Sequence, residues 1–429
     1  MSETMKKPRI RFKGFTEAWE QRKLGELVKE GILEAPLDGN HGEKHPTSDE
    51  YVESGIPFLM ASDIHNGEVN IYSCKYITKE RAERLDKGFA RNGDVLLTHK
   101  ATIGETAILS NLMTEYAMLA PQVTYYRIKN EERLNREYLY SFFNSLDFQT
   151  ELKTKAAQST RPYIGITAQQ NLKIILPTEI DEQRKIGLYF GNLDRLITLH
   201  QRKCDEVKSL KKYMLQKMFP QNEQKVPEIR FEGFTEAWEQ RKLGDLVDRV
   251  TRKNQDLVSE LPLTISAQYG LIDQNEFFDK RVASKDVSGY YLIENGEFAY
   301  NKSTSTDAPW GAIKRLYRYE NGVLSTLYIV FGIKENNPVD SDFLVSYYST
   351  NLWHKGIHEI AAEGARNHGL LNIAPADFFE TKLMIPQDIE EQKKIGKYFE
   401  ELERLITLHQ QKCEELKKIK KFMLQKMFV

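Results

Sequence analysis

The chain lacks the features of a membrane-spanning or secreted protein. Its 429 residues contain no run of about 18 apolar residues, and the opening MSETMKKPRI has no apolar core of a signal peptide. Three cysteines (Cys74, Cys204 and Cys413) are too few, and odd in number, for a disulfide framework. We therefore expect a cytoplasmic protein in a reducing compartment.

Signatures of catalysis are also missing. The sequence has no G-x-x-x-x-G-K-[ST] loop for nucleotide phosphates, no G-x-G-x-x-G dinucleotide turn and no Asp/Asn-Pro-Pro-aromatic tetrapeptide of the amino-methyltransferases. Cys-x-x-Cys, His-Glu-x-x-His and G-x-S-x-G do not occur. We predict no catalytic residue, no metal site and no cofactor on this chain, although nuclease carboxylates are hard to see in a single sequence.

A surplus of positive charge is absent as well. Lysine and arginine number 61 and aspartate and glutamate 62, which leaves a net charge of −1. Bulk electrostatic attraction to nucleic acid is therefore not expected, and any polyanion must be held by local basic patches.

What the chain has instead is internal repetition. Residues 8–28 return as 227–247 with three differences in 21 positions, and residues 177–219 return as 386–428 with 29 of 43 positions identical. The segments between, roughly 29–176 and 248–385, have diverged almost completely. Repetition of this kind decides the architecture, and it indicates one frame used twice for one kind of partner, with two different inserts.

The second repeat predicts two long helices. Both copies are rich in Leu, Lys, Glu, Gln and Met, which favour helices. In the first copy the apolar positions follow a spacing of 4-3-4-3-4-3, as in the seam of a coiled coil; these are Ile186, Phe190, Leu193, Ile197, His200, Cys204 and Val207. Each helix of about 39 residues would be about 58 Å long. We expect the two to pair antiparallel, with a pseudo-two-fold axis.

Two histidines and two cysteines lie on these seams. His200 and Cys204 are four residues apart, as are His409 and Cys413, so a four-ligand zinc site is conceivable where the helices cross. A small thiol and an imidazole can equally fill a coiled-coil seam, and we favour that interpretation.

The inserts predict one mixed α/β fold with two different surfaces. Short β-branched and aromatic runs broken by Gly, Pro and Asn indicate strands, and residues 136–157 and 342–362 have helical periodicity. Apolar positions match at an offset of 205, for example Tyr138 with Phe343 and Phe142 with Tyr347.

Polar turns recur at matched places in both inserts. Lys, Arg, Ser, Thr and Asn on such turns suit contacts with phosphates and base edges, although any single turn can equally be merely solvated. The candidate DNA-binding residues are Lys100, Thr102, Thr160, Arg161 and Tyr163 in the first insert and Lys302, Ser303, Ser305, Arg366, Asn367 and His368 in the second.

The whole pattern resembles a known family. W-E-x-x-x-L-G-[ED] segments at Trp19–Glu26 and Trp238–Asp245, each followed by a variable region and then an acidic-Gln-basic helix start (residues 181–186 and 390–395), are similar to the specificity subunits of type I restriction-modification systems. The resemblance covers essentially the whole chain. It implies an α+β protein with target-recognition domains at 1–176 and 220–385 and spacer helices at 177–219 and 386–429.

The resemblance also implies the biochemistry. Each domain would read one half of a bipartite DNA target, and the helix pair would set the gap. Two modification (methyltransferase) subunits and the restriction subunits would dock on the chain, and those partners would carry S-adenosylmethionine, Mg and ATP. Six residues of the repeated frame are the expected docking contacts: Trp19, Leu24, Gln183, Trp238, Leu243 and Gln392.

Two other functions stay open from the sequence. One is a protein-protein scaffold whose inserts bind two partners and no DNA. The other is a self-sufficient DNA methyltransferase or nuclease, against which the missing motifs argue.

Overall fold

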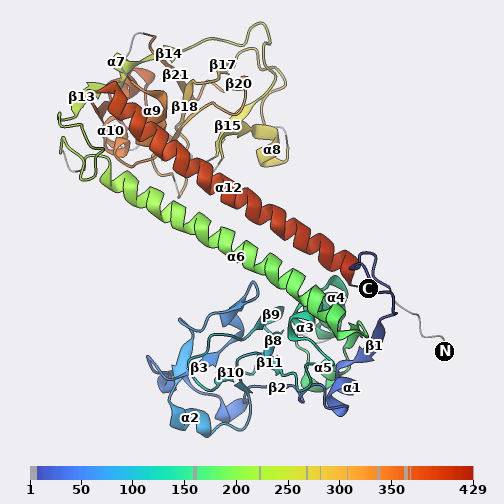
Figure 1. The fold of residues 1–429 in the computed structure, drawn as a ribbon. Helices are drawn as coiled ribbons and strands as arrows, with labels where there is room; N and C mark the ends of the chain where they lie inside the picture. The colour runs from blue at the N-terminus through green and yellow to red at the C-terminus, as the bar shows by residue number, and fades with distance from the viewer. Residues whose placement is uncertain are drawn as a thin grey trace. The chain divides into compact units, whose positions relative to one another are not determined.

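A computed structural model describes residues 7–157, 162–221, 224–266, 269–280, 282–306, 308–335, 339–361, 366–367 and 369–428. The chain divides into two compact units. Unit 1 comprises residues 1–202 with 410–429, and unit 2 comprises residues 203–409. The helices α6 (Ile180–Lys217) and α12 (Ile389–Met427), labelled in Figure 1, are thus shared, because each contributes one part to each unit.

The two long helices confirm the sequence prediction. Their bounds lie within three residues of 177–219 and 386–428 at either end. Most of the predicted seam is buried, including Phe190 in α6 and Phe399 in α12. Within unit 1 Asp194 of α6 contacts Lys420 of α12, and within unit 2 Lys211 of α6 contacts Glu403 of α12. Phe190, which is nearer the start of α6 than Asp194, contacts Phe428, which directly follows the end of α12. A step toward the start of α6 is thus a step toward the end of α12, so the helix segments of unit 1 pair antiparallel.

The described residues of unit 1 form twelve strands and five short α-helices, besides the segments of α6 and α12 that belong to this unit. The strands are β1 (Glu20–Lys23), β2 (Leu37–Asp38), β3 (Ile56–Leu59), β4 (Ile64–His65), β5 (Glu68–Val69), β6 (Lys75–Ile77), β7 (Phe89–Ala90), β8 (Val95–Lys100), β9 (Thr102–Ile108), β10 (Ala117–Leu119), β11 (Val123–Tyr126) and β12 (Lys173–Leu176). The helices are α1 (Leu24–Lys29), α2 (Lys79–Glu83), α3 (Arg136–Phe143), α4 (Leu146–Ala156) and α5 (Ile166–Gln170).

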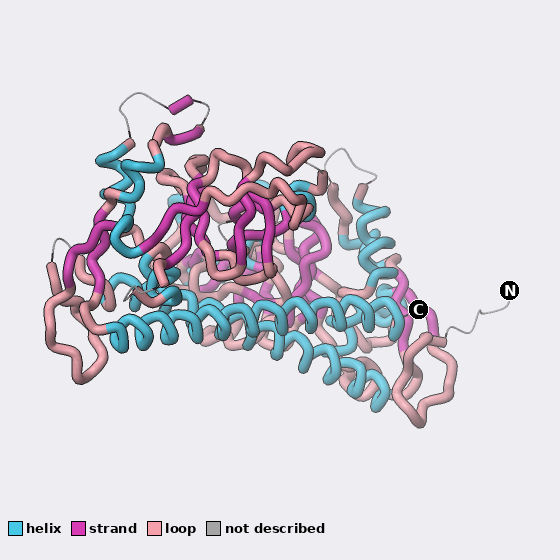
Figure 2. The backbone as a smooth tube through the Cα atoms, turned by 90° about the horizontal axis from the view of Figure 1, so that it is seen from above, coloured by secondary structure: helices cyan, strands magenta, loops and turns pink. Residues whose placement is uncertain are grey.

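Unit 2 has elements of the same kinds. Its strands are β13 (Glu239–Lys242), β14 (Val247–Val250), β15 (Leu263–Ser266), β16 (Gly270–Asp273), β17 (Tyr291–Glu294), β18 (Phe298–Asn301), β19 (Ala312–Arg315), β20 (Asn321–Leu324), β21 (Ile329–Ile333), β22 (Arg366–Asn367), β23 (Leu370–Leu371) and β24 (Lys382–Ile385). Its short helices are α7 (Leu243–Leu246), α8 (Gln274–Phe278), α9 (Ser341–Tyr347), α10 (Trp353–Ile360) and α11 (Pro375–Phe379). Figure 2 shows these short helices and strands, in cyan and magenta, beside the two long helices.

The two inserts share one strand topology. An antiparallel sheet runs β2-β11-β8-β9 in unit 1 and β14-β21-β18-β19 in unit 2. A second sheet runs β6-β3-β10-β7 in unit 1, with β3 and β10 parallel. In unit 2 the corresponding order is β16-β15-β20-β17. It consists of the two pairs β16-β15 and β20-β17, which a parallel bridge between Pro262 and Val323 joins. The prediction of one mixed α/β fold in both inserts is confirmed.

Each long-helix start is fixed by a buried carboxylate. In unit 1 Glu182 is fully buried and accepts two hydrogen bonds from Arg11, at 2.6 Å from Nε and 2.8 Å from Nη2. The indole nitrogen of Trp19 donates a third at 3.1 Å. A buried charge is tolerated only when it is paired and hydrogen-bonded, and here Arg11 and Trp19 meet that demand.

Unit 2 repeats this carboxylate site. Glu391 accepts from Arg230 Nε at 2.7 Å and Nη2 at 2.8 Å, and from Trp238 Nε1 at 3.4 Å. All six residues of the two sites therefore belong to the repeated segments, three in each copy, and the arginine precedes the tryptophan by eight positions in both.

A phenylalanine at the end of the opposite long helix completes each core. In unit 1 Phe428 packs against Phe190, with ring centroids 5.6 Å apart, and against Trp19 and Tyr138. In unit 2 the matching Phe219 packs against Phe343, Tyr347, Trp238 and Phe399. The two helix termini are thereby built into globular cores, which explains why the units exchange helix segments.

Gly187 and Gly396 lie where the long helices approach the starts of α3 and α9 closely. A Cβ on Gly187 would lie 2.8 Å from the Tyr138 amide nitrogen and 2.7 Å from Asn135 Oδ1 at the start of α3. A Cβ on Gly396 would meet the start of α9 at 2.7 Å from the Phe343 nitrogen. Glycine is required at both positions because no larger residue fits against a backbone group.

We predict opposite effects of alanine at two glycines of α6. Gly187→Ala should destabilise the protein by about 1–3 kcal/mol, because overpacking against the α3 backbone exceeds the gain in helix propensity. Gly191→Ala should stabilise it by up to about 1 kcal/mol, because nothing lies within 4 Å of the added Cβ. Urea unfolding of the two variants measures the difference, and equal effects would show that α3 does not press on α6.

Candidate nucleic-acid interface

The predicted reading turns lie at the ends of two equivalent strands. In unit 1 the β8–β9 turn carries Lys100 and Thr102, both exposed, on either side of Ala101, whose φ is +66°. In unit 2 the turn after β18 carries Lys302, Ser303 and Ser305. Strand pairing places β18 at the position that β8 occupies in the first sheet, so the two turns are structurally equivalent.

In unit 1 the structure joins the two loops that the sequence singled out separately. Lys100 forms an antiparallel bridge with Tyr163, and the Ile164 amide donates to the His99 carbonyl at 3.2 Å. Tyr163 is 39% exposed, so its ring stands at the surface beside the turn. Thr160 and Arg161 lie outside the described residues.

Unit 2 joins its loops in the same way. Ser303 forms an antiparallel bridge with Leu370, and the Leu371 amide donates to the Lys302 carbonyl at 3.0 Å. Arg366 and Asn367 form β22, whose backbone pairs with β23, and so enter the same backbone ladder. His368 lies outside the described residues. In both units, then, a turn after the equivalent strand and the segment before α5 or α11 form one continuous surface.

Buried polar side chains fix the base of this surface in unit 1. The Ile164 carbonyl accepts from Gln169 Nε2 at 3.0 Å and lies 3.0 Å from His99 Nδ1. Gln169 Oε1 in turn accepts from the Tyr126 hydroxyl at 2.7 Å. Burial lowers the pKa of His99, so the ring is neutral at pH 7 and its Nδ1–H can donate to the carbonyl.

Lys302 takes the place of His99 in unit 2. Its Nζ donates to the Ile373 carbonyl at 3.4 Å, and partial burial lowers the pKa of the ammonium group. Ser303 and Ser305 are exposed, whereas Lys302 is half-buried. Among the predicted contacts of this turn, the serines are therefore the ones presented to a ligand, and Lys302 supports them from below.

The six predicted docking residues are corrected by the structure. Trp19, Leu24, Trp238 and Leu243 are all at most 4% exposed, inside the cores of their units. Repetition shows that a residue is needed in both copies, but a shared core needs the same residues as a shared docking surface.

Gln183 and Gln392 also serve the fold. Gln183 Oε1 accepts from the Asn135 amide at 3.0 Å, and its Nε2 donates to the Pro177 carbonyl at 3.0 Å. Gln392 makes the matching bonds to Asp340 and Pro386, both 2.8 Å. Each glutamine fastens the start of α3 or α9 to a long helix. A side chain buried in this way cannot touch a second protein.

Exposed apolar side chains of the long helices are the docking candidates that sequence reasoning missed. With the seam residues at heptad positions a and d, Leu196 and Leu199 of α6 and Ile419 and Phe422 of α12 fall at positions g and c. All four are exposed and belong to unit 1. In an antiparallel pair the g positions flank the same edge, so these side chains form one apolar stripe.

Unit 2 carries the matching stripe at the same heptad positions, and its members are Leu210, Tyr213, Leu405 and Leu408. Leu210, Tyr213 and Leu408 are 44–50% exposed. A heptad plot that followed positions g and c as well as a and d would have found both stripes.

The histidine and cysteine pairs do not gather into a metal site in the part of the chain that the structure describes. The Cys204 thiol lies 4.0 Å from the Ile406 carbonyl in unit 2, and the Cys413 thiol 3.7 Å from Gln201 Oε1 in unit 1. All three cysteines are free and buried. Within the described residues, no helix is long and apolar enough to cross a membrane.

These features define a class: a chain with two like α/β units, each built on segments of two shared helices and each presenting a polar surface at the same sheet edge. The model of the type I restriction modification DNA specificity domain matches residues 16–209 and again 235–418. The chain belongs to this family, with two copies of its domain.

Individual relatives agree with the assignment. The MjaVIII specificity subunit of Methanocaldococcus jannaschii is 24% identical over 203 residues, which are 46% of this chain and 45% of that protein. The match thus spans about half the length of that relative. The MjaX specificity subunit of the same organism is 23% identical over 426 residues, covering 94% of this chain and 91% of that one.

A solved structure shares the fold. The S subunit of a type I restriction-modification system from M. genitalium superposes with a TM-score of 0.63 at 13% identity, covering 98% of this chain and 99% of that chain.

Proposed function

We propose that this chain is the DNA-reading, non-catalytic subunit of a type I restriction-modification complex. One observation carries the proposal: the two family-domain copies present structurally equivalent polar surfaces, around Lys100 and around Ser303, whose residues differ. Equivalent positions let both units meet a DNA duplex in the same manner. Different side chains let each unit select its own bases, because sequence is read by side chains at base edges.

The target in this proposal is bipartite. Unit 1 reads one half-site and unit 2 the other, and α6 and α12 set the spacing because both helices run from one unit into the other. The methyl donor S-adenosylmethionine, Mg and ATP belong to the partner subunits.

The modification subunits dock, in this proposal, on the g/c stripes of the two units. Two copies of one partner need two like surfaces, and the stripes are apolar, exposed and repeated in sequence. Exposed apolar side chains in a contiguous stripe are typical of protein contact sites. The chain therefore offers one stripe for each modification subunit.

Selection from a random duplex pool tests the reading function. The chain with its modification subunits should enrich a split motif. Enrichment of no motif, with an unchanged assembly of partner subunits, would favour the protein-protein scaffold. Methyl transfer or cleavage by the chain alone would favour the self-sufficient enzyme.

Variants of the two reading surfaces should each affect only one half-site of the selected motif. Lys100→Ala should relax selection in one half-site only and Arg366→Ala in the other, each at a cost of about 1–3 kcal/mol against the native bases. Competition binding with duplexes altered in one half-site measures this. Equal loss in both half-sites from either variant would mean that these residues do not read bases.

Variants of the two stripes should remove partners one at a time. Phe422→Glu in unit 1 or Tyr213→Glu in unit 2 should each release one modification subunit, and the pair should release both, because a carboxylate cannot be buried in an apolar contact. Native mass spectrometry counts the subunits. Glu400→Lys, at an exposed position of α12 outside both stripes, is the control, and a full complement in the double variant would place docking elsewhere.

A further inference from the structure

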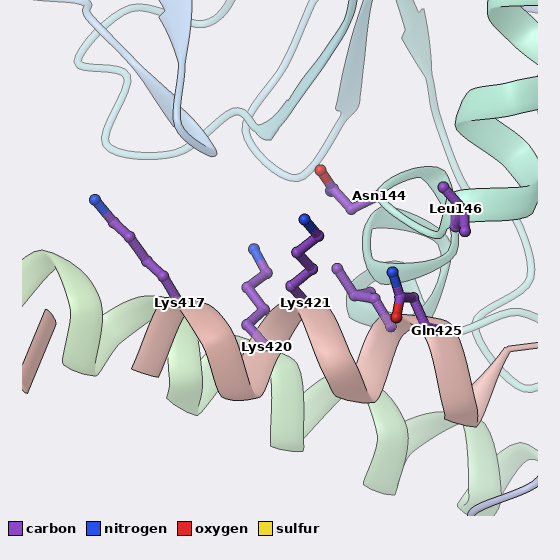
Figure 3. Close-up of a pocket in the computed structure, with 7 residues that line it drawn as sticks. Asn144, Leu146, Lys417, Lys420, Lys421 and Gln425 are labelled. Carbon is purple, nitrogen blue, oxygen red and sulfur yellow. The ribbon is translucent and has the colours of Figure 1, made fainter. Parts of the chain in front are cut away.

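Three lysines of α12 face the globular part of unit 1 across a pocket (Figure 3). Lys417, Lys420 and Lys421 form one wall. Asn144 and Leu146, at the junction of α3 and α4, form the other, and Leu424 and Gln425 complete the lining. In Figure 3 the lysine side chains rise from the helix toward the strands and loops of the unit.

Only one of these three lysines forms an ion pair within the described residues. Lys420 Nζ lies 2.5 Å from Asp194 Oδ1, so its charge is paired across the helix seam. Lys417 and Lys421 are exposed, and neither forms an ion pair among the described residues. The pocket therefore carries about two uncompensated positive charges on a chain whose net charge is −1.

The pocket connects directly to the reading surface of unit 1. Asn144 Nδ2 donates to Thr106 Oγ1 at 2.7 Å, and Gln149 Nε2 donates to the Gly104 carbonyl at 2.9 Å. Both acceptors lie on β9, which begins at Thr102 beside the reading turn. Four residues of strand span about 14 Å, which corresponds to about four base-pair steps along a duplex.

We infer that Lys417 and Lys421 bind phosphates of the DNA backbone next to the half-site that unit 1 reads. This rests on the proposed function and adds to it a contact from the helix rather than from the recognition domain. Ammonium groups on flexible stems suit phosphate oxygens, and they carry no base preference. The neutral lining of Asn144, Leu146, Leu424 and Gln425 leaves no carboxylate to repel a phosphate beyond the one that Lys420 already neutralises.

Salt dependence of binding tests the inference. Each phosphate contact contributes about 0.9 to the slope of log affinity against log salt concentration. For the chain assembled with its modification subunits, the Lys417→Ala/Lys421→Ala variant should have a slope shallower by about 1.8. Between 50 and 200 mM salt the wild type should then lose about tenfold more affinity than the variant. The selected motif should not change.

The matched control is Lys418→Ala. Lys418 is exposed on the same turn of α12 but occupies heptad position f, which points away from the seam. Its loss removes one positive charge, where the double variant removes two, and it should leave the slope unchanged. A slope shallower by about 0.9 in Lys418→Ala, which is the effect expected of each lysine in the double variant, would mean diffuse attraction rather than a site and would overturn the inference.

Other outcomes separate this inference from the proposed function. An unchanged slope in the double variant, with a split motif still selected by the wild type, would refute the lysine contact alone. An unchanged slope with loss of a modification subunit would assign the lysines to an acidic protein partner and refute it as well. Failure of the wild type to select any motif would refute the proposed function. Thermal unfolding of each variant confirms that the fold is retained.

Discussion

The structure depends on a buried carboxylate that appears twice. Glu182 and Glu391 stand at the first turn of the long helices, and each is held by an arginine and a tryptophan from the other repeated segment of its copy. Breaking a buried ion pair typically costs about 3–5 kcal/mol, so this contact strongly constrains where each long helix leaves its globular unit. Both copies of the repeated frame supply the same arginine and tryptophan to satisfy this charge.

The frame leaves the inserts free to differ. Strand order and the bridge between the two polar loops are common to both units, whereas the side chains on those loops are not. His99 and Lys302 illustrate this, because they occupy one structural position with different chemistry below the reading surface. A backbone ladder that is independent of side chains can support many recognition surfaces.

Much of the fold follows from sequence pattern alone. The heptad spacing predicts both long helices and their seam, and the offset of 205 predicts one fold for two dissimilar inserts. The helical periodicity of residues 136–157 does not reveal that this segment forms two helices, α3 and α4. The break lies at Ser145, which caps α4 by accepting a hydrogen bond from Phe148 N. A local cap overrides the wider pattern there.

The sites were harder to predict for a physical reason. Trp19 and Gln183 are repeated because of core contacts that lie more than 40 residues apart in sequence, and repetition alone does not distinguish these from contacts with a partner. Lys211 and Lys420 interrupt the apolar seam, a pattern that suggests looser packing between the two helices. Each of them nevertheless pairs with an acidic side chain on the facing helix. Local pattern marks such positions, but only tertiary geometry supplies their partners.

The central claim is that two independent readers are held by one shared pair of helices. Its most direct measurement is a matched insertion of four residues, one helical turn, into α6 after Arg202 and into α12 after His409, where the units exchange helix segments. About 6 Å of added helix should lengthen the spacer of the selected motif by one or two base pairs and leave both half-sites unchanged. An unchanged spacer, or a change of bases within either half-site, would contradict the account.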